Sequence, residues 1–273
     1  MFNDLHNDRR DEPKITRPVI GAAIAVAIAA LLGWFYWYSH RAPRVPVSVQ
    51  PTIPAPQEDR IQHPVPDAEA AALGPIPELN SSDAAIRDAL GKAGGGTSFM
   101  RYWVPENIIR HLVVTVDNLS RQKVAVDKRP LAPAAGTFIA NGDELHATLD
   151  TRNFDRYQPI VDEIRKVDMQ QLASVYLHFY PLFQKAYQDL GYPNGYFNDR
   201  LVSVIDGLLA APQVAGPIEL VRPNVMYQFA DPALESRTAG QKLLIRMGPD
   251  NAAAVKAKLA ELRAIITAAP LKH

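Results

Sequence analysis

Two carboxylates and a hydroxyl share one face of a predicted helix in the segment YFNDRLVSVIDGLLAAP. Asp199, Ser203 and Asp206 follow one another at spacings of four and three residues, so their side chains align along one helical face. A glycoside hydrolase needs two carboxylates facing one site, one as general acid and the other as base or nucleophile. This pattern makes Asp199 and Asp206 candidate catalytic residues for glycan hydrolysis.

The same carboxylates also have a structural interpretation. Asp199 falls in the first turn of the helix, where a negative charge suits the helix dipole, and Asn198 is the expected cap. Asp206 is expected to form an ion pair with an arginine such as Arg200 or Arg222. We favour this interpretation, because no Ser/His/Asp ordering and no HExxH or GxSxG motif accompanies the two carboxylates.

Tyr192 and Tyr196 end a run of aromatic residues just before this helix. Their rings either pack in the core or form a surface on which sugars stack, and core packing is favoured because large rings at helical spacing usually become buried. Together with Arg200 and Arg222, these tyrosines are the candidate binding residues.

The strongest helical pattern runs from Asp168 to Leu190. Apolar positions recur at steps of 4, 3, 4, 3 and 4 residues, which predicts one continuous seam. Pro181 cannot donate a backbone hydrogen bond, so the helix should kink or divide there, and Gly191 is placed to end it. The seam consists of Leu172, Tyr176, Phe179, Phe183, Ala186 and Leu190.

Other patterns predict shorter elements on both sides of this seam. A short helix AAIRDAL is expected to end at the loop that begins with Gly91, and Pro105 should open the helix PENIIRHLVVTVDNL. The pair Asn141-Gly142 predicts a hairpin within 138–149. IELVRP and VMYQFA are strand candidates, and two helices follow them, the second with Val255, Leu259, Leu262 and Ile266 facing inward.

An uncharged stretch of twenty residues, 19–38, is long enough to cross a bilayer as a helix, at ~1.5 Å per residue. Five aromatic residues at 34–38 suit the lipid interface and differ from the small residues of a signal-peptide cleavage site, which is the alternative. Four basic residues precede the stretch and two follow it closely, so we expect a cytoplasmic N-terminus and a domain on the outer side. The lipid bilayer is therefore an expected partner.

Nine of the 23 prolines lie between residues 41 and 77. Proline fixes φ and lacks an N–H donor, which favours an extended spacer over a core. A PxxP ligand is the alternative, although a tether beside a membrane explains the position better.

The fold class predicted is mainly α with minor β: a transmembrane helix, a proline-rich linker and one compact helical domain with a short hairpin and short strands. The expected units are a cytoplasmic tail (1–18), the membrane helix (19–38), a disordered linker (39–78) and a globular helical domain (79–273).

The charge balance and the cysteine content exclude some kinds of partner and site. From residue 79 onward, 22 Lys and Arg stand against 20 Asp and Glu, so no basic surface for nucleic acid is expected. The chain has no cysteine, which excludes disulfides and thiolate metal sites. We predict no cofactor and no metal.

Several long phrases resemble the bacterial family called domain of unknown function 3014. The resemblance implies a membrane-anchored envelope protein of the proteobacterial type, but it brings no known activity, ligand or catalytic residue. Position 207 is Gly where the family phrase has His, so no histidine stands beside Asp206. The phrases are VVTVDNL (113–119), NFDRY (153–157), YPLFQKAYQDLGYP (180–193), YFNDRLVSVIDGLLAAP (196–212), FADPALE (229–235) and AGQKLLIRMGP (239–249).

Two functions remain. The favoured one is a non-catalytic envelope protein that binds a protein or cell-wall partner at a distance set by its tether. The alternative is a glycan-directed hydrolase or lytic enzyme that uses Asp199 and Asp206 beside Tyr192 and Tyr196.

Overall fold

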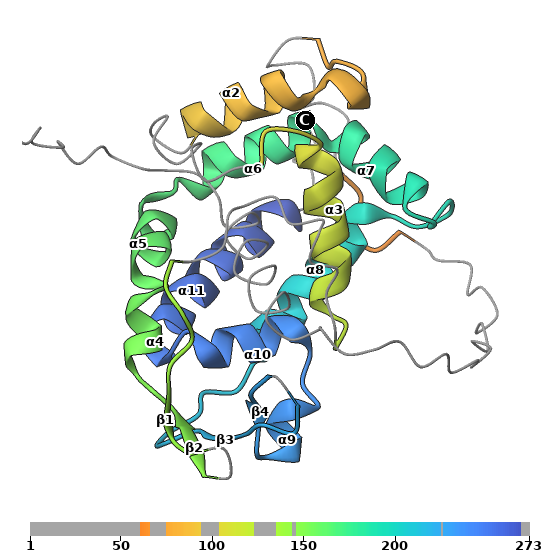
Figure 1. The fold of residues 1–273 in the computed structure, drawn as a ribbon. Helices are drawn as coiled ribbons and strands as arrows, with labels where there is room; N and C mark the ends of the chain where they lie inside the picture. Colours follow the sequence, from red (N-terminus) through yellow and green to blue (C-terminus); the bar gives the residue numbers. More distant parts are fainter. Residues whose placement is uncertain are drawn as a thin grey trace, which may run out of the picture.

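The computed structural model describes residues 61–65, 75–93, 104–122, 135–143, 146–224 and 226–268. Helices account for most of these residues, and four short strands form one antiparallel sheet. The predicted class, mainly α with minor β, is confirmed for this part of the chain. Figure 1 shows the helices gathered into one body, with the sheet at one end beside α9 and α10.

The predicted membrane helix (19–38), the tail before it (1–18) and most of the predicted linker (39–78) lie outside the described residues. Among the residues that the structure describes, no helix is both long and apolar enough to span a membrane. Val65 and Ile76 belong to the predicted linker, and both pack against the helical core.

One large apolar cluster joins the helices. The helix α11 packs against α5, α6 and α8, while α3 packs against α7 and α8. Consequently α8, which carries the candidate carboxylates, lies between α3 and α11. The helices are α2 (Asp83–Ala93), α3 (Ile108–Leu119), α4 (Arg152–Asp155), α5 (Gln158–Lys166), α6 (Met169–His178), α7 (Tyr180–Asp189), α8 (Phe197–Leu209), α9 (Pro232–Glu235), α10 (Ala239–Arg246) and α11 (Pro249–Ile266), and a short 3-10 helix, η2 (Leu79–Ser81), precedes α2.

The helical periodicity identified the buried faces. All four apolar positions predicted to face inward on α11 are buried, and so are Leu172, Tyr176, Phe179 and Phe183 of the α6–α7 seam. The seam ends earlier than predicted, because Leu190 is 38 % exposed. It lies after the last turn of α7, where the chain leaves the core.

Pro181 divides the seam as predicted: α6 ends at His178 and α7 begins at Tyr180. Proline then occupies the first turn of α7, where its missing N–H has no helical partner to lose. Gly191 follows α7 with φ of 119°, a backbone conformation that a residue with a Cβ rarely adopts.

Two predicted helix ends are wrong. The helix α2 continues through Gly91 to Ala93, and α3 begins at Ile108 rather than at Pro105. The start of α3 is set from another helix, because the Asp83 carboxylate accepts hydrogen bonds from the backbone N–H groups of Asn107 (2.8 Å) and Ile108 (2.9 Å).

The sheet has the order β1 (Ala140–Gly142), β2 (Ala147–Leu149), β3 (Glu219–Val221) and β4 (Gln228–Phe229). The predicted hairpin and both later strands are confirmed. However, Asn141 and Gly142 do not form its turn: they pair within β1 with Thr148 and Ala147. Contact between β2 and β3 joins segments ~70 residues apart, which local patterns cannot predict.

Candidate functional site

The first turn of α8 holds a segment of the predicted linker. The Asp199 carboxylate accepts hydrogen bonds from the backbone N–H groups of Gln62 (3.0 Å) and His63 (2.7 Å). The Tyr196 hydroxyl, just before α8, accepts one from the backbone N–H of Val65 (2.7 Å). Two of the predicted site residues therefore contact main-chain donors of residues 61–65.

Asn198 completes this contact from inside the core. Its side chain is fully buried, and its Nδ2 donates to the backbone carbonyls of His63 (2.9 Å) and Ile266 (3.2 Å). Its Oδ1 accepts from the Tyr176 hydroxyl (3.0 Å). Asn198 was predicted to be the helix cap, and this was wrong: it lies inside α8, and Tyr196 occupies the cap position. We call Tyr196, Asn198 and Asp199 the α8 clamp.

Asp206 forms an ion pair with a residue that was not predicted from the sequence. Arg263 of α11 donates through Nε to Oδ1 and through Nη2 to Oδ2 (3.0 Å). Hydrogen bonding to Arg263 holds the pKa of Asp206 below its usual range, and the charge of nearby His63 acts in the same direction. The predicted partners, Arg200 and Arg222, are not the residues that bind it.

Asp199 and Asp206 are widely spaced for a glycosidase pair. They are seven residues apart in α8, which is a rise of roughly 10 Å between their backbones along the helix axis, whereas glycosidase carboxyl groups lie ~5 to 9.5 Å apart. A general acid also needs a raised pKa, whereas the pKa of Asp206 is lowered. This geometry suits attachment of other segments to α8 better than proton transfer.

A second cluster of polar side chains surrounds the carboxylate of Asp117 on α3. Asp117 is buried, with 3 % of its surface exposed. Arg200 donates to its Oδ1 through Nε (3.1 Å) and Nη2 (2.8 Å), and Arg121 donates to Oδ2 (2.6 Å). The Tyr192 hydroxyl lies 3.3 Å from both oxygens, and Arg200 also bonds Ser120. Arg200 and Tyr192 thus connect α8 and the end of α7 to α3.

The aromatic run packs mainly in the core, as favoured. Tyr187 stacks on Tyr192 with ring centroids 4.6 Å apart, and burial raises the pKa of Tyr187 to about 12. Tyr196 packs at 5.6 Å from Tyr180. Tyr187 thus covers one face of the Tyr192 ring, and both Tyr192 and Tyr196 are partly buried against the core. Arg222 lies elsewhere, with its guanidinium 5.5 Å from the ring centre of Tyr227 beside the sheet.

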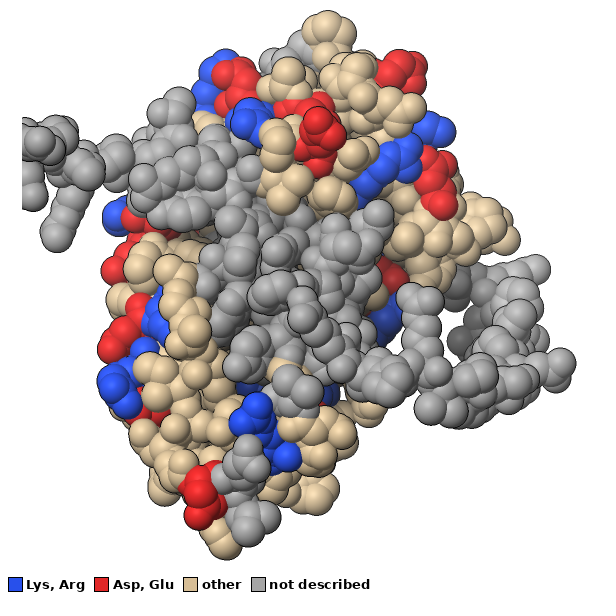
Figure 2. Space-filling model, in the orientation of Figure 1, with Lys and Arg blue, Asp and Glu red and all other residues tan. Residues whose placement is uncertain are grey.

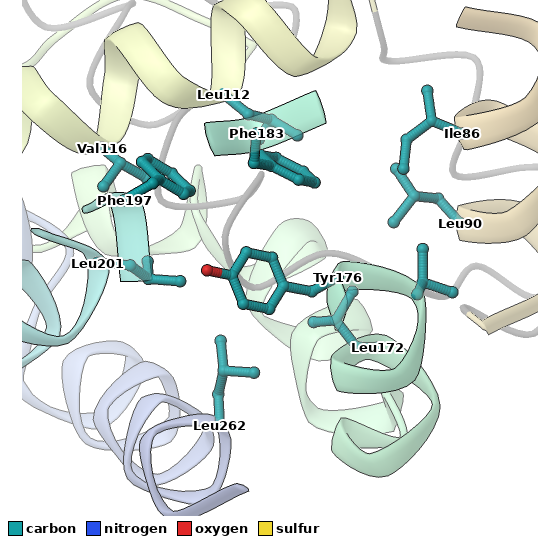
Figure 3. A pocket seen from close by; sticks show the side chains of 11 residues that line it. Ile86, Leu90, Leu112, Val116, Leu172, Tyr176, Phe183, Phe197, Leu201 and Leu262 are labelled. Carbon is teal, nitrogen blue, oxygen red and sulfur yellow. The ribbon is translucent and has the colours of Figure 1, made fainter. Parts of the chain in front are cut away.

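An apolar cavity of about 40 Å³ lies in the core. Side chains of α2, α3, α6, α7, α8 and α11 line it (Figure 3). It is much smaller than a dry cavity of ~150 Å³ that binds benzene. This cavity is a packing defect rather than a ligand site, and none of the six predicted site residues lines it.

Filling the cavity should stabilise the domain. Val116 lines it, so Val116→Ile places one more methylene in existing space and should raise the free energy of unfolding by ~0.5 to 1 kcal/mol. Val113 is also buried on α3 but does not line the cavity, and Val113→Ile should instead be neutral or destabilising. Chemical denaturation of both variants checks this; equal effects would contradict it.

A larger cleft of about 740 Å³ lies between the sheet, the segment 212–218 and the start of α11. None of the predicted site residues lines it either. On the face seen in Figure 2, acidic and basic side chains of the described residues are interspersed. Among these residues, no group of three or more His, Asp or Glu is arranged to hold a metal ion.

Asp117 and Arg263 are functional candidates that were not predicted from the sequence. Asp117 is the single acid in the apolar phrase VVTVDNL, and this isolation was a usable signal for a buried, paired carboxylate. Arg263 lies 57 residues from its partner Asp206, and no local pattern connects the two.

A family model described as a protein of unknown function (DUF3014) matches residues 108–263. This region begins with α3 and includes nearly all of α11. It therefore contains the residues around Asp117 and the α8 clamp. A search of curated proteins gives no match. A search of solved structures gives none either.

Proposed function

The chain belongs to the DUF3014 family, and on that premise we propose that it is a non-catalytic binding or scaffold protein of the bacterial cell envelope. In this proposal, residues 19–38 anchor it in the inner membrane, with the N-terminus in the cytoplasm. The helical domain faces the periplasm and binds an envelope protein or a cell-wall component. The uncharged stretch and the excess of basic residues before it support this topology.

One observation carries the binding function: the polar residues of α8 hold other parts of the chain. Asp199 binds two backbone N–H groups, and Asp206 binds Arg263 through both of its oxygens. Carboxylates used in this way act by attachment. Attachment of this kind needs no proton transfer.

The alternative is a glycan-directed hydrolase or lytic enzyme that uses Asp199 and Asp206. It requires one carboxyl group with a raised pKa facing the other across a substrate. The lowered pKa of Asp206 and its pairing with Arg263 oppose a role for Asp206 as the general acid. We therefore favour binding over hydrolysis.

Complementation of a deletion strain separates the two functions. Asp206→Asn removes the charge of the candidate acid while keeping its size, and a binding protein carrying it should restore the deletion phenotype to the level of the unsubstituted chain. Asp162→Asn on α5, an exposed acid paired with Arg165, is the matched control. A folded Asp206→Asn protein at normal abundance that reproduces the deletion, while the control complements, would overturn the proposal.

A further inference from the structure

Residues 61–65 are held by the α8 clamp almost entirely through their main chain. The clamp uses the N–H groups of Gln62, His63 and Val65 and the carbonyl of His63. The side chains of Ile61, Gln62 and Pro64 are exposed. A site that contacts backbone groups recognises the backbone conformation of a peptide more than its sequence.

The chemistry of the clamp suits a peptide ligand. Asp199 offers two carboxylate oxygens to two successive N–H groups, and hydrogen bonds to a charged acceptor are the stronger ones. Pro64, which has no N–H, stands at the position between the donors of His63 and Val65. Val65 then packs against the apolar core.

We propose that the α8 clamp is a peptide-binding site whose resident ligand is the chain's own segment 61–65. The segment acts as a releasable latch. Among the residues that the structure describes, its contacts with the clamp and core are few: the segment donates three hydrogen bonds, accepts one and packs one apolar side chain. Only nine residues separate it from Pro75, so the latch recloses at a high effective concentration.

Given the proposed membrane tether, opening the latch increases the distance that the domain can reach from the membrane. With residues 61–65 docked, only 39–60 separate the membrane from the domain, which is at most ~70 Å at ~3.1 Å per residue. With the latch open, residues 39–74 span up to ~110 Å, because Ile76 still packs against the core. Opening would therefore extend the accessible distance from the membrane by about 40 Å, by the same measure.

Two nitroxide labels test the latch in the full-length chain, because the chain has no cysteine of its own. Ile61→Cys marks the segment, and Ala257→Cys marks an exposed position on α11. Pulsed dipolar spectroscopy should give one narrow distance. Asp199→Ala should broaden it at least twofold, and so should Tyr196→Phe, which keeps the ring and removes the hydroxyl that accepts from Val65.

The control for this experiment is Asp162→Ala on α5, which should leave the distance narrow. A broad distribution in the otherwise unsubstituted chain would contradict the latch. A narrow distribution that survives both clamp variants would contradict it equally. Tyr196→Phe keeps the test valid if Asp199→Ala disturbs the start of α8.

A second arm tests the clamp as a peptide site. Gln62→Pro with His63→Pro removes both donors to Asp199 from the resident segment and leaves the clamp intact. A fluorescent peptide of residues 59–67 should bind this chain at least tenfold more tightly than the unsubstituted chain. Adding Asp199→Ala should abolish the difference. Equal binding to all three chains would overturn the peptide site.

These measurements are independent of any envelope partner. Failure to find a partner in cells would count against the proposed function and leave the latch untouched. Conversely, a broad label distance would remove the latch without affecting the choice between binding and hydrolysis.

Discussion

A Gly248→Ala variant is expected to lose roughly 3 kcal/mol of unfolding free energy. Gly248 joins α10 to α11 with φ of 88° and ψ of 160°, a region that is essentially restricted to glycine and costs ~1 to 3 kcal/mol otherwise. An added Cβ would also lie 2.6 Å from the Cγ of Phe154. Such overpacking costs a further ~1 to 3 kcal/mol.

The surrounding structure cannot relax easily around this position. Asn251 of α11 is buried and donates through Nδ2 to the carbonyls of Phe154 (3.0 Å) and Met247 (2.9 Å), which fixes the backbone on both sides of the contact. Urea denaturation of the purified full-length chain in detergent measures the loss.

Gly207→Ala is the matched control for this prediction. Gly207 lies in α8, and an added Cβ there meets nothing within 4 Å. Alanine in a helix interior is favoured over glycine by ~0.5 to 1 kcal/mol, so this variant should be more stable than the unsubstituted chain. Equal stability of the two alanine variants would contradict the structural account of Gly248.

An Asp117→Ala variant is expected to lose about 2 to 3 kcal/mol of unfolding free energy. Removing one partner of a buried ion pair leaves an uncompensated charge, which costs ~3 to 5 kcal/mol when the remaining charge is fully buried. The side chain of Arg200 keeps 25 % exposure, so solvent reduces this cost. The same change also deprives Tyr192 of its acceptor.

Arg121→Ala tests the more exposed of the two ion pairs that Asp117 forms, and it is compared with the loss of Asp117 itself. The Arg121 side chain is 53 % exposed, and exposed ion pairs contribute ~0 to 1 kcal/mol. Thermal and urea unfolding of both variants should therefore rank Asp117→Ala as clearly the more damaging. A loss of the same size in Arg121→Ala would show that the burial of Asp117 is not what matters.

Helical periodicity identified the buried faces because it depends only on local spacing. The seam of α6 and α7 and the inward face of α11 were predicted in this way, and the division at Pro181 was predicted from the missing N–H of proline. The exposure of Leu190, just after α7, was not predicted. The start of α3 was not predicted either, since it depends on a segment elsewhere in the fold. Asp83, 25 residues before Ile108, supplies the acceptor that begins α3.

At the candidate site, too, local sequence patterns do not identify contacts with remote segments. The sequence placed Asp199 and Asp206 on one face of α8, and that alignment is what lets Asp199 hold Gln62 and His63 while Asp206 holds Arg263. Their partners could not be predicted, because both come from remote segments.

Asn198 was misassigned for a related reason. A polar residue ahead of an apolar run has the composition of a cap, and only tertiary contacts distinguish a cap from a buried amide. The proline-rich composition of 39–78 likewise predicted a spacer, while Val65 and Ile76 pack against the core.

The central proposal is a domain held at the periplasmic face of a membrane, and protease accessibility in spheroplasts tests it most directly. With an epitope tag after His273, protease added to intact spheroplasts should remove the tag from membrane-bound protein, while a cytoplasmic marker stays uncut. A tag that becomes accessible only after lysis, or full-length chain recovered in the soluble fraction, would contradict the proposal.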